Sequence, residues 1–390
     1  MADAAKYILV TGGSFINKGA QAMTFITADQ MAKRFPGCQV VLLSHYEARL
    51  PEEEKRKFRI KFMPFPRKMH RFKLRLHIRD EYTELFKNAV ALLDISGYRL
   101  GSNWGISSMK GYLNKIELAQ HFGIPVYLMP QSFGPFELHG IKSWGLFSRI
   151  RRTLSRVKVI MAREQESYRQ LVDVFKLDNV VLTPDLVLQS EEVAPENIYT
   201  SQYVPVCLDV PAGSVAVIPN SRNFEYGSKD AILDLYRHAI GKLLADGRHV
   251  YLVAHSTEDV NVCKDLKRLF AADNDNVVLV EQDFNCLDFC GFVRQFDFVI
   301  ASRFHSIVHA YREKVPALIV GWANKYKELS INLSQEKYFY DVRKGLDAKE
   351  ILDALDCLEN NHQEESRKIA EALKALKEKN VYEYIELKRD

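Results

Sequence analysis

The chain has 390 residues, and because a single hydrophobic core stops growing at about 250–300 residues, two domains are expected. Hydrophobic residues make up 47% of the sequence and charged residues 27%, a balance that excludes a largely disordered chain. The formal net charge of +4 is too small for a dedicated nucleic-acid-binding domain, so no nucleic-acid partner is expected.

Strands and helices are expected to alternate through the first half of the chain. Short β-branched apolar runs predict strands, and stretches with helical periodicity separate them. The predicted strands cover residues 7–11, 39–44, 89–95, 125–129, 157–162 and 180–182, and the predicted helices cover residues 19–35, 112–121, 146–154 and 165–175. This alternation is typical of a parallel sheet that is covered by helices.

The alternation starts again after a polar stretch at 189–204, which we interpret as a linker. The predicted strands of the second unit cover residues 214–218, 249–254, 277–280, 298–301 and 316–320, and its predicted helices cover residues 230–245, 259–270, 287–295 and 305–312. A charged amphipathic stretch at 348–388 is expected to form a final helix. The sequence therefore predicts an α/β protein with two similar open units, at residues 1–190 and 205–345, and a C-terminal helical segment at 346–390.

The six cysteines favour neither a disulfide framework nor a zinc site. Only Cys286 and Cys290 lie close together, and there is no CxxC pair, whereas structural zinc sites need clustered cysteines and histidines. The N-terminus lacks the pattern of a signal peptide, and no stretch reaches the ~18 apolar residues of a membrane span. We therefore expect reduced thiols, no metal, and a cytoplasmic protein that can still contact the inner membrane face.

Polar residues follow several predicted strands in the first unit, and ligands of open α/β sheets bind beyond the carboxyl ends of the strands. The glycine-rich loop at 12–20 is either a ligand-contacting loop or a tight strand-to-helix turn. Asn103 and Trp104 lie in a loop that is typical of sugar recognition, with an ordinary surface loop as the alternative. Gln131 and Ser132 offer neutral hydrogen-bonding groups at the same crevice.

Four basic residues are expected to converge at strand ends between the two units. Arg163 follows one strand directly, although an ion pair with the next glutamate is an alternative. Arg303 and His305 are expected in an extended turn where both face one side, and Lys325 follows the neighbouring strand. Guanidinium beside imidazole suits an anionic substrate and proton transfer. A lone histidine is more often structural, but this cluster predicts a crevice for a small, multiply charged anion.

The motifs of several other enzyme classes are missing from the sequence. It has no paired-carboxylate pattern of a glycosidase, no GxSxG nucleophile motif and no HExxH zinc motif. The glycine-rich loop is neither GxGxxG nor a phosphate-binding loop ending in GK[ST]. Function therefore depends on the cationic crevice.

Six segments, which occur in the family's order, resemble the polysaccharide pyruvyl transferase family. They are Asn17-Lys-Gly-Ala20, Gln131-Ser-Phe-Gly-Pro135, Ala162-Arg163-Glu164, Pro184-Asp185-Leu186, Ser302-Arg-Phe-His305 and Val315-Pro316 through Lys325. The resemblance spans residues 7–329. It implies a glycosyltransferase-B-like fold, in which two Rossmann-like domains face a central crevice with the acceptor side on the N-terminal domain and the phosphoenolpyruvate side on the C-terminal domain.

The resemblance also implies a reaction and its residues. The expected reaction moves the enolpyruvyl group of phosphoenolpyruvate onto a galactose-type residue of a surface polysaccharide, or of its polyprenyl-diphosphate-linked precursor, as a cyclic ketal with release of phosphate. Phosphoenolpyruvate is a co-substrate, and no cofactor is expected. The expected residues are His305 and Arg303 for catalysis, Arg163, Arg303, Lys325, Gln131 and Ser132 for donor binding, and Asn17, Asn103 and Trp104 for acceptor binding.

Two segments depart from the family pattern, both in the N-terminal half. Many members have an acidic residue where this chain has Ala20, and many have a GGGS-like loop where this chain has Ser96-Gly97-Tyr98-Arg99. The resemblance therefore leaves the identity of the acceptor open. Two other functions remain as alternatives: a nucleotide-sugar glycosyltransferase of the same architecture, and a non-catalytic polysaccharide-assembly protein.

Residues 55–79 are dense in lysine and arginine, contain no acidic residue, and are interleaved with phenylalanines. Such a stretch can dock on anionic lipid or contact the diphosphate of a lipid carrier. The alternative is a solvated basic excursion between a strand and a helix. The first interpretation predicts peripheral membrane contact through this segment.

Overall fold

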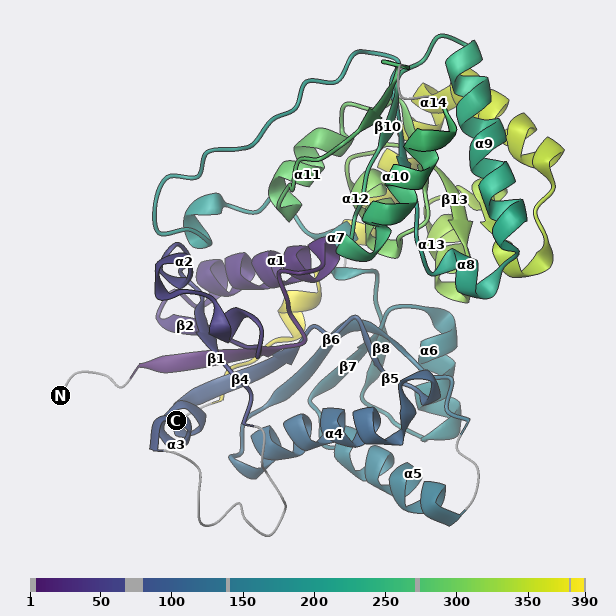
Figure 1. Ribbon diagram of the computed structural model, residues 1–390. Helices are drawn as coiled ribbons and strands as arrows, with labels where there is room; N and C mark the ends of the chain where they lie inside the picture. The colour runs from purple at the N-terminus through teal and green to yellow at the C-terminus, as the bar shows by residue number, and fades with distance from the viewer. Residues whose placement is uncertain (1–4, 67–79, 138–140, 271–273, 379, 389–390) are drawn as a thin grey trace.

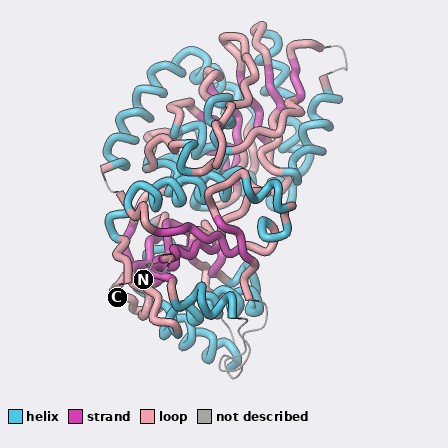
Figure 2. The backbone as a smooth tube through the Cα atoms, turned by 90° about the vertical axis from the view of Figure 1, so that its left-hand side faces the viewer, coloured by secondary structure: helices cyan, strands magenta, loops and turns pink. Residues whose placement is uncertain are grey.

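The computed structural model of the chain describes residues 5–66, 80–137, 141–270, 274–378 and 380–388. The described part contains two parallel sheets, one in each half of the chain, and helices cover both faces of each sheet (Figure 1). The view at right angles shows the two sheets as separate layers (Figure 2). The predicted α/β architecture with two facing domains is therefore confirmed.

The N-terminal sheet follows the strand order β3-β2-β1-β4-β6-β7-β8, and β5 pairs with β6 outside this path. Its strands are β1 (Lys6–Thr11), β2 (Cys38–Leu43), β3 (Lys61–Met63), β4 (Ala89–Asp94), β5 (Tyr98–Leu100), β6 (Val126–Phe133), β7 (Val159–Ala162) and β8 (Val180–Leu182). Strand β4 is buried along its whole length, as expected for a central strand with helices on both faces.

The C-terminal sheet follows the order β11-β10-β9-β12-β13-β14. Its strands are β9 (Val215–Ile218), β10 (Val250–Leu252), β11 (Val277–Leu279), β12 (Phe298–Ala301), β13 (Ala317–Gly321) and β14 (Phe339–Asp341). The α-helices of the chain are α1 (Lys18–Arg34), α2 (Glu52–Arg56), α3 (Asp80–Lys87), α4 (Gly105–His121), α5 (Ile141–Leu154), α6 (Gln165–Arg169), α7 (Leu186–Gln189), α8 (Asn223–Tyr226), α9 (Lys229–Ala245), α10 (Val260–Leu269), α11 (Cys286–Val293), α12 (Phe304–Arg312), α13 (Asn324–Asn332) and α14 (Ala348–Lys377). None of the helices in the described ranges is long and apolar enough to cross a membrane.

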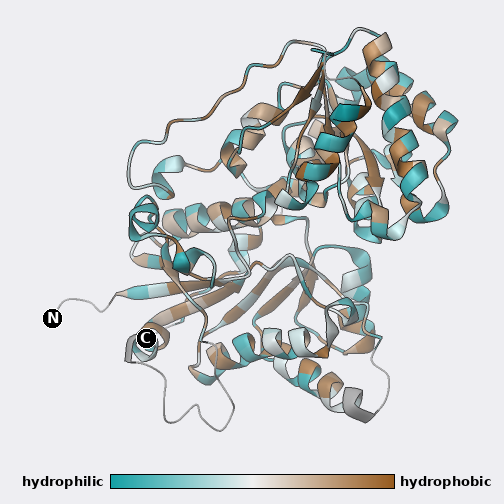
Figure 3. Ribbon diagram, viewed as in Figure 1, coloured by the Kyte–Doolittle hydropathy of each residue, from teal (hydrophilic) through white to brown (hydrophobic). Residues whose placement is uncertain are grey.

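Helix α1 lies at the interface between the domains (Figure 1). It packs against α7 in its own domain and against α11 and α12 of the C-terminal domain. Phe25, Ile26 and Met31 of this helix belong to one buried apolar cluster that continues into both domains. Apolar residues are concentrated in the strands and on the helix faces turned toward them (Figure 3). A helix that is enclosed on most sides in this way buries residues around its circumference, and in α1 these include the polar Thr27 and Asp29 beside the apolar side chains.

The predicted strand at 125–129 was shorter than the observed strand β6. The predicted strand ended at residue 129, but β6 continues to Phe133. Its pairing with β7 shifts register between Leu128 and Gln131, on either side of Pro130. A proline lacks the backbone N–H that a ladder needs, so it ends the sequence pattern although the strand resumes after the irregularity.

The C-terminal segment connects both domains. Helix α14 packs against α9 of the C-terminal domain, and the chain then returns to the N-terminal sheet, where the Lys388 N–H donates to the Val90 carbonyl at 2.8 Å. The prediction of one helix through residue 388 was wrong, because α14 ends at Lys377. The tail instead buries Val381 and Tyr382 against the N-terminal domain.

Candidate active site

The two sheets place one pair of helix starts face to face. Strand β1 has β2 and β4 as neighbours, and β9 has β10 and β12, so the strand order reverses at the centre of each sheet. Ligands of open α/β folds bind at such points. Helix α1 follows β1, α12 follows β12, and the two helices contact each other across the domain interface. The centre of the crevice is therefore built from their first turns.

A glycine makes this contact possible. A Cβ atom on Gly19 would lie 2.2 Å from Cγ of His305, so the imidazole packs directly on the first turn of α1. The helix is capped by Asn17, whose Oδ1 accepts hydrogen bonds from the N–H groups of Gly19 at 2.9 Å and Ala20 at 3.2 Å. The predicted acceptor-binding residue Asn17 therefore has a local role, which is to fix the helix end that contacts His305.

Arg163 follows β7 and is buried. Its Nη1 donates to Oδ2 of Asp185 at 2.9 Å, its Nη2 donates to Oγ of Ser132 at 2.8 Å, and its Nε lies 3.4 Å from Oε2 of Glu164. The guanidinium carbon also lies 4.3 Å from the centre of the Phe304 ring. The expected glutamate pair exists, but the shorter bond joins Arg163 to Asp185, so several partners fix the guanidinium plane.

Arg303 and His305 do not share one face, and the prediction of an extended turn was wrong. Helix α12 begins at Phe304, directly after Arg303, so the two side chains diverge. Arg303 makes a two-pronged ion pair with Asp259, with both N···O distances at 2.7 Å, and its Nη2 also donates to Glu258 at 2.9 Å. Both carboxylates lie on the short helical segment Thr257–Asp259, which therefore orients Arg303.

His305 lies close to Asp185 on the other side of α12. Its Nε2 is 3.9 Å from Oδ2 of Asp185 and makes no hydrogen bond with any residue that the structure describes. Burial lowers the pKa of His305 to about 4; Asp185 opposes this shift, whereas Arg163 and Lys325 add to it. The imidazole is therefore neutral at pH 7 before any ligand binds.

Unlike the two arginines of the cluster, Lys325 makes no ion pair with a carboxylate of the described residues. Its Nζ lies 5.2 Å from the centre of the Phe304 ring, 5.8 Å from Trp322 and 5.6 Å from Tyr326. Burial lowers its pKa to about 8, and the Arg163 guanidinium contributes in the same direction. An ammonium group that is surrounded by ring faces is available to an incoming anion.

A cavity of about 250 Å³ opens beside Lys325 between the domains. Ser132 and Asn103 line it from the N-terminal domain, and Trp322 and Lys325 line it from the C-terminal domain. Hydrogen bonds join the domains nearby, because Nδ2 of Asn324 donates to Glu166 at 2.7 Å. Three of the predicted residues, Asn103, Ser132 and Lys325, thus line one cavity.

Two further predicted crevice residues, Gln131 and Trp104, are occupied by contacts of their own. Gln131 is buried, and its amide bonds to Asp94 at 3.1 Å and to Tyr112 at 3.3 Å within the N-terminal domain. Trp104 is 41% exposed, but the guanidinium of Arg99 lies 4.7 Å from the centre of its ring. Neither side chain lines the cavity beside Lys325, and the lining does not include Arg163, Arg303 or His305 either.

A family model described as polysaccharide pyruvyl transferase matches residues 17–324, well over half of the chain and a range that contains Arg163, Arg303 and His305 and ends one residue before Lys325. The chain belongs to the polysaccharide pyruvyl transferase family. It is therefore a transferase that acts in the pyruvylation of polysaccharides. A comparison with curated proteins found no match.

Solved structures of low sequence identity share the architecture of this pyruvyl transferase family member. They include an S. aureus MnaA–UDP complex (10% identity, TM-score 0.55, covering 94% of this chain and 91% of that chain). They also include the Neisseria meningitidis UDP-GlcNAc 2-epimerase bound to UDP-GlcNAc (13%, 0.53, 95% and 98%) and a Rickettsia africae glycosyltransferase (13%, 0.53, 97% and 98%). At these identities the similarity shows the glycosyltransferase-B fold alone.

Sequence reasoning missed the carboxylates of this pyruvyl transferase. Asp185 bonds to Arg163 and lies near His305, and Asp259 bonds to Arg303, yet neither was predicted as a site residue. Asp185 belongs to a family-like segment and follows a strand, so its position was a usable signal. Asp259 lies in a short helical segment with no sequence signal of its own. No cluster of metal-binding side chains occurs within the described ranges.

The described part of the basic segment 55–79 is committed to the fold of the enzyme. Phe58 and Phe62 pack with Phe15 at centroid distances of 5.1 and 5.6 Å, deep in the N-terminal domain. Lys57 pairs with Glu54 at 2.7 Å. These two aromatic rings therefore pack inside the domain, and peripheral membrane contact through the segment stays a prediction. Residues 67–79 lie outside the described part of the chain.

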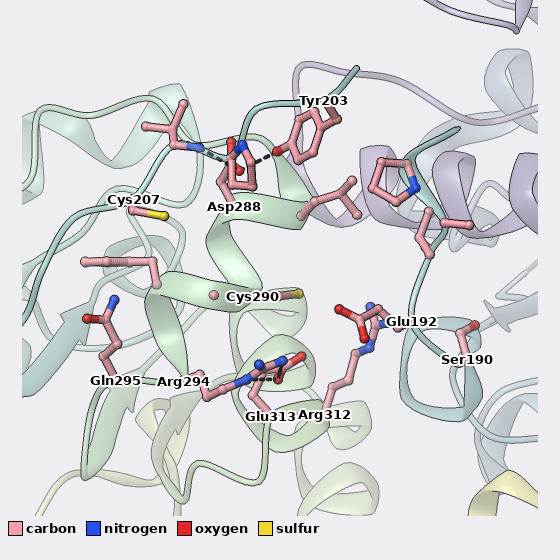
Figure 4. A pocket seen from close by; sticks show the side chains of 18 of the residues that line it. Ser190, Glu192, Tyr203, Cys207, Asp288, Cys290, Arg294, Gln295, Arg312 and Glu313 are labelled. Carbon is pink, nitrogen blue, oxygen red and sulfur yellow. Dashed lines mark hydrogen bonds and ion pairs between the residues drawn. The ribbon is translucent and has the colours of Figure 1, made fainter. Parts of the chain in front are cut away.

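A further cavity, of about 1020 Å³, lies between the interdomain linker and helices α11 and α12 (Figure 4). Three of the charged residues that line it have partners within the protein. Arg294 pairs with Glu313 at 2.6 Å, and Asp288 accepts hydrogen bonds from the Tyr203 hydroxyl and the Val206 N–H. We interpret these contacts as bonds that fasten the linker to the C-terminal domain.

Proposed function

We propose that the enzyme transfers the enolpyruvyl group of phosphoenolpyruvate to a sugar diol as a cyclic ketal and releases phosphate. One observation carries this proposal. The first turn of α12 brings Arg163 and Lys325 to the same aromatic ring, Phe304, at 4.3 and 5.2 Å, directly beside His305. Two cations and one titratable group around the first turn of α12 suit a small anion that must be protonated.

The arginines have donors left for such an anion. A guanidinium has five N–H donors. Arg303 uses Nε and Nη2, so both N–H groups of its Nη1 are free of described partners. Arg163 uses one bond from each of its three nitrogens, which leaves two donors. The carboxylates therefore orient the two guanidinium groups without exhausting them, and Lys325 adds a free positive charge.

The donor is expected to change the protonation of His305. Before binding, burial holds the pKa of His305 at about 4, so the imidazole is neutral. A phosphate and a carboxylate nearby stabilise the charged form and raise this pKa. We propose that His305 takes up a proton when phosphoenolpyruvate binds. Binding of the donor therefore converts His305 into the protonated form that can act as a general acid.

The proposed reaction begins with a proton transfer to the donor. Protonated His305 gives its proton to C3 of the donor, which leaves an electron-deficient C2. One sugar hydroxyl attacks C2, the C2–O bond to phosphate breaks, and a second hydroxyl closes the ketal ring. Of the two hydroxyl protons, one restores His305 and the other leaves with phosphate. General-acid assistance of this kind contributes about 10²–10⁴ to the rate.

The proposed acceptor is a galactose-type residue, whose 4- and 6-hydroxyl groups close a six-membered ketal ring. Surface polysaccharide and its polyprenyl-diphosphate-linked precursor are the two forms to compare. The second form would bring the enzyme to the inner membrane face. Parallel assays with a free and a lipid-linked galactosyl acceptor separate the two, since turnover restricted to the lipid-linked form would show that the carrier is recognised.

The decisive experiment incubates the purified protein with phosphoenolpyruvate and a galactosyl-terminated acceptor. Phosphate release and the mass of the acceptor are followed together. The expected result is phosphate release with a pyruvyl ketal on the acceptor, which Lys325→Met reduces strongly. Lys327→Met is the matched control, because Lys327 is an exposed lysine of the same helix.

One result would overturn the donor assignment. No turnover, together with no shift in melting temperature on addition of phosphoenolpyruvate, would show that the crevice does not bind this anion. A melting shift with a uridine or guanosine diphosphate sugar instead would favour the nucleotide-sugar glycosyltransferase alternative.

A further inference from the structure

A second interdomain cavity, of about 570 Å³, lies at the carboxyl ends of β10 and β11. His305, after β12, separates it from the cavity beside Lys325, which lies after β13, because the strand order is β11-β10-β9-β12-β13. The N-terminal residues show the same separation. The second cavity is lined by the loops after β1 and β2, whereas the cavity beside Lys325 is lined by the loops after β6 and β7. The contact between Gly19 and His305 thus has a cavity on each side.

The second cavity combines an aromatic and apolar rim with neutral polar groups. Tyr46 is 54% exposed and Ile16 is 49% exposed, both on the N-terminal side. Gln282, Ser256 and Thr257 contribute amide and hydroxyl groups from the C-terminal side. Exposed aromatic faces with nearby amides and hydroxyls suit a ligand that has apolar faces and many hydroxyl groups.

The lysine nearest to the centre of the crevice is already neutralised. Nζ of Lys18 donates to Oδ1 of Asp283 at 2.8 Å and also to the Phe284 carbonyl. It therefore differs from Lys325, which has no carboxylate partner among the described residues. The lining of the second cavity contains two lysines, Lys18 and Lys264, and two carboxylates, Glu281 and Asp283, so its formal charges cancel, and this argues for an uncharged ligand.

His255 supplies an independent sign of a missing ligand. It lines the second cavity and is 1% exposed, and neither of its ring nitrogens has a partner within the described ranges. Burial lowers its pKa well below the ordinary value, so the ring is neutral, with one donor and one acceptor nitrogen. A hydroxyl group both donates and accepts, so it complements a neutral imidazole, whereas an anion only accepts.

We propose that this second cavity binds the acceptor saccharide as an uncharged oligosaccharide chain. The terminal diol approaches His305 past Lys18, and the preceding sugar residues extend along the cavity toward Tyr46. A volume of about 570 Å³ falls in the range of about 300–1,000 Å³ that is typical of ligand pockets. This inference rests on the proposed pyruvyl transfer, and it assigns the donor and the acceptor to opposite sides of His305.

The test compares two substitutions at the rim, Tyr46→Ala and Gln282→Ala, with Tyr384→Ala as the control. All three side chains are exposed, so the variants are expected to fold, and Tyr384 lies in the C-terminal tail, away from the cavity. Initial rates are measured with acceptors of one, two and three sugars. Each rim variant is expected to raise the KM for the longer acceptors about 2- to 10-fold without changing the KM for phosphoenolpyruvate, since an aromatic contact or a neutral hydrogen bond contributes about 0.5–1.5 kcal/mol.

Saturation-transfer NMR with the same trisaccharide, without phosphoenolpyruvate, reads binding separately from turnover. Binding that both rim variants weaken supports the cavity even if the wild-type protein does not turn over phosphoenolpyruvate, an outcome that would refute only the proposed reaction. Normal turnover by the rim variants with every acceptor length would refute the assignment of the acceptor to this cavity without contradicting the proposed reaction. Absence of saccharide binding by the wild-type protein in both measurements would also overturn it.

Discussion

The contact between Gly19 and His305 predicts the effect of adding a single methyl group. In Gly19→Ala the new Cβ would lie 2.2 Å from Cγ of His305, whereas ordinary contacts begin at 3.4 Å. The ring must therefore move by at least about 1 Å, or the domains must separate. A displacement of about 1 Å of a reacting group costs about 10²-fold in rate. We expect kcat for phosphate release to fall by about this factor.

The same substitution is expected to change stability in a way that a matched control reveals. Overpacking costs about 1–3 kcal/mol, whereas alanine in place of an unhindered helical glycine gains about 0.5–1 kcal/mol. Gly111 lies within α4, and a Cβ on it would meet nothing within 4 Å. Gly111→Ala should therefore raise the free energy of urea-induced unfolding, and Gly19→Ala should lower it.

One result would refute this reasoning about α1 and α12. If Gly19→Ala kept wild-type kcat and gained as much stability as Gly111→Ala, the imidazole could not pack on the first turn of α1. A loss of stability with unchanged kcat would instead show that the contact exists but does not position His305 for the reaction.

Four further predictions follow from the same groups. Because Lys325 loses its charge above its pKa of about 8, donor affinity measured by calorimetry should fall as pH rises through 8, and Lys325→Met should lack this step. Phosphoenolpyruvate binding at pH 7 should take up a proton, seen as a dependence of the heat on the buffer, and His305→Gln should abolish the uptake. The pKa of His305 is about 4 in the folded state and 6.5 ordinarily, so the unfolded state binds the proton first as the pH falls. The free energy of unfolding should therefore decrease by up to about 3 kcal/mol between pH 6.5 and pH 4. The decrease should be smaller in His305→Gln. Exposed Cys207 should react with a thiol reagent in the native protein, whereas buried Cys286, whose pKa burial raises, should react only after unfolding; equal rates would contradict its burial.

Much of the fold could be predicted from the sequence, because the deciding signals are local. The apolar run at 298–301 ends where β12 ends, and the run at 180–182 matches β8. The predictions failed where a local signal was interrupted, as at Pro130 in β6. They also failed where burial depended on distant residues, as in the tail at 381–388, which packs on the N-terminal domain.

The sequence by itself also determined which residue types follow the strands, and hence that Arg163, His305 and Lys325 gather near one crevice. Only the tertiary structure decided their partners and charges. Asp185 lies 22 positions from Arg163 and Asp259 lies 44 positions from Arg303, so neither ion pair leaves a local pattern. The protonation of His305 likewise depends on burial between two domains. Strand ends are local properties of a chain, whereas electrostatic environment is a sum over everything that folding brings near.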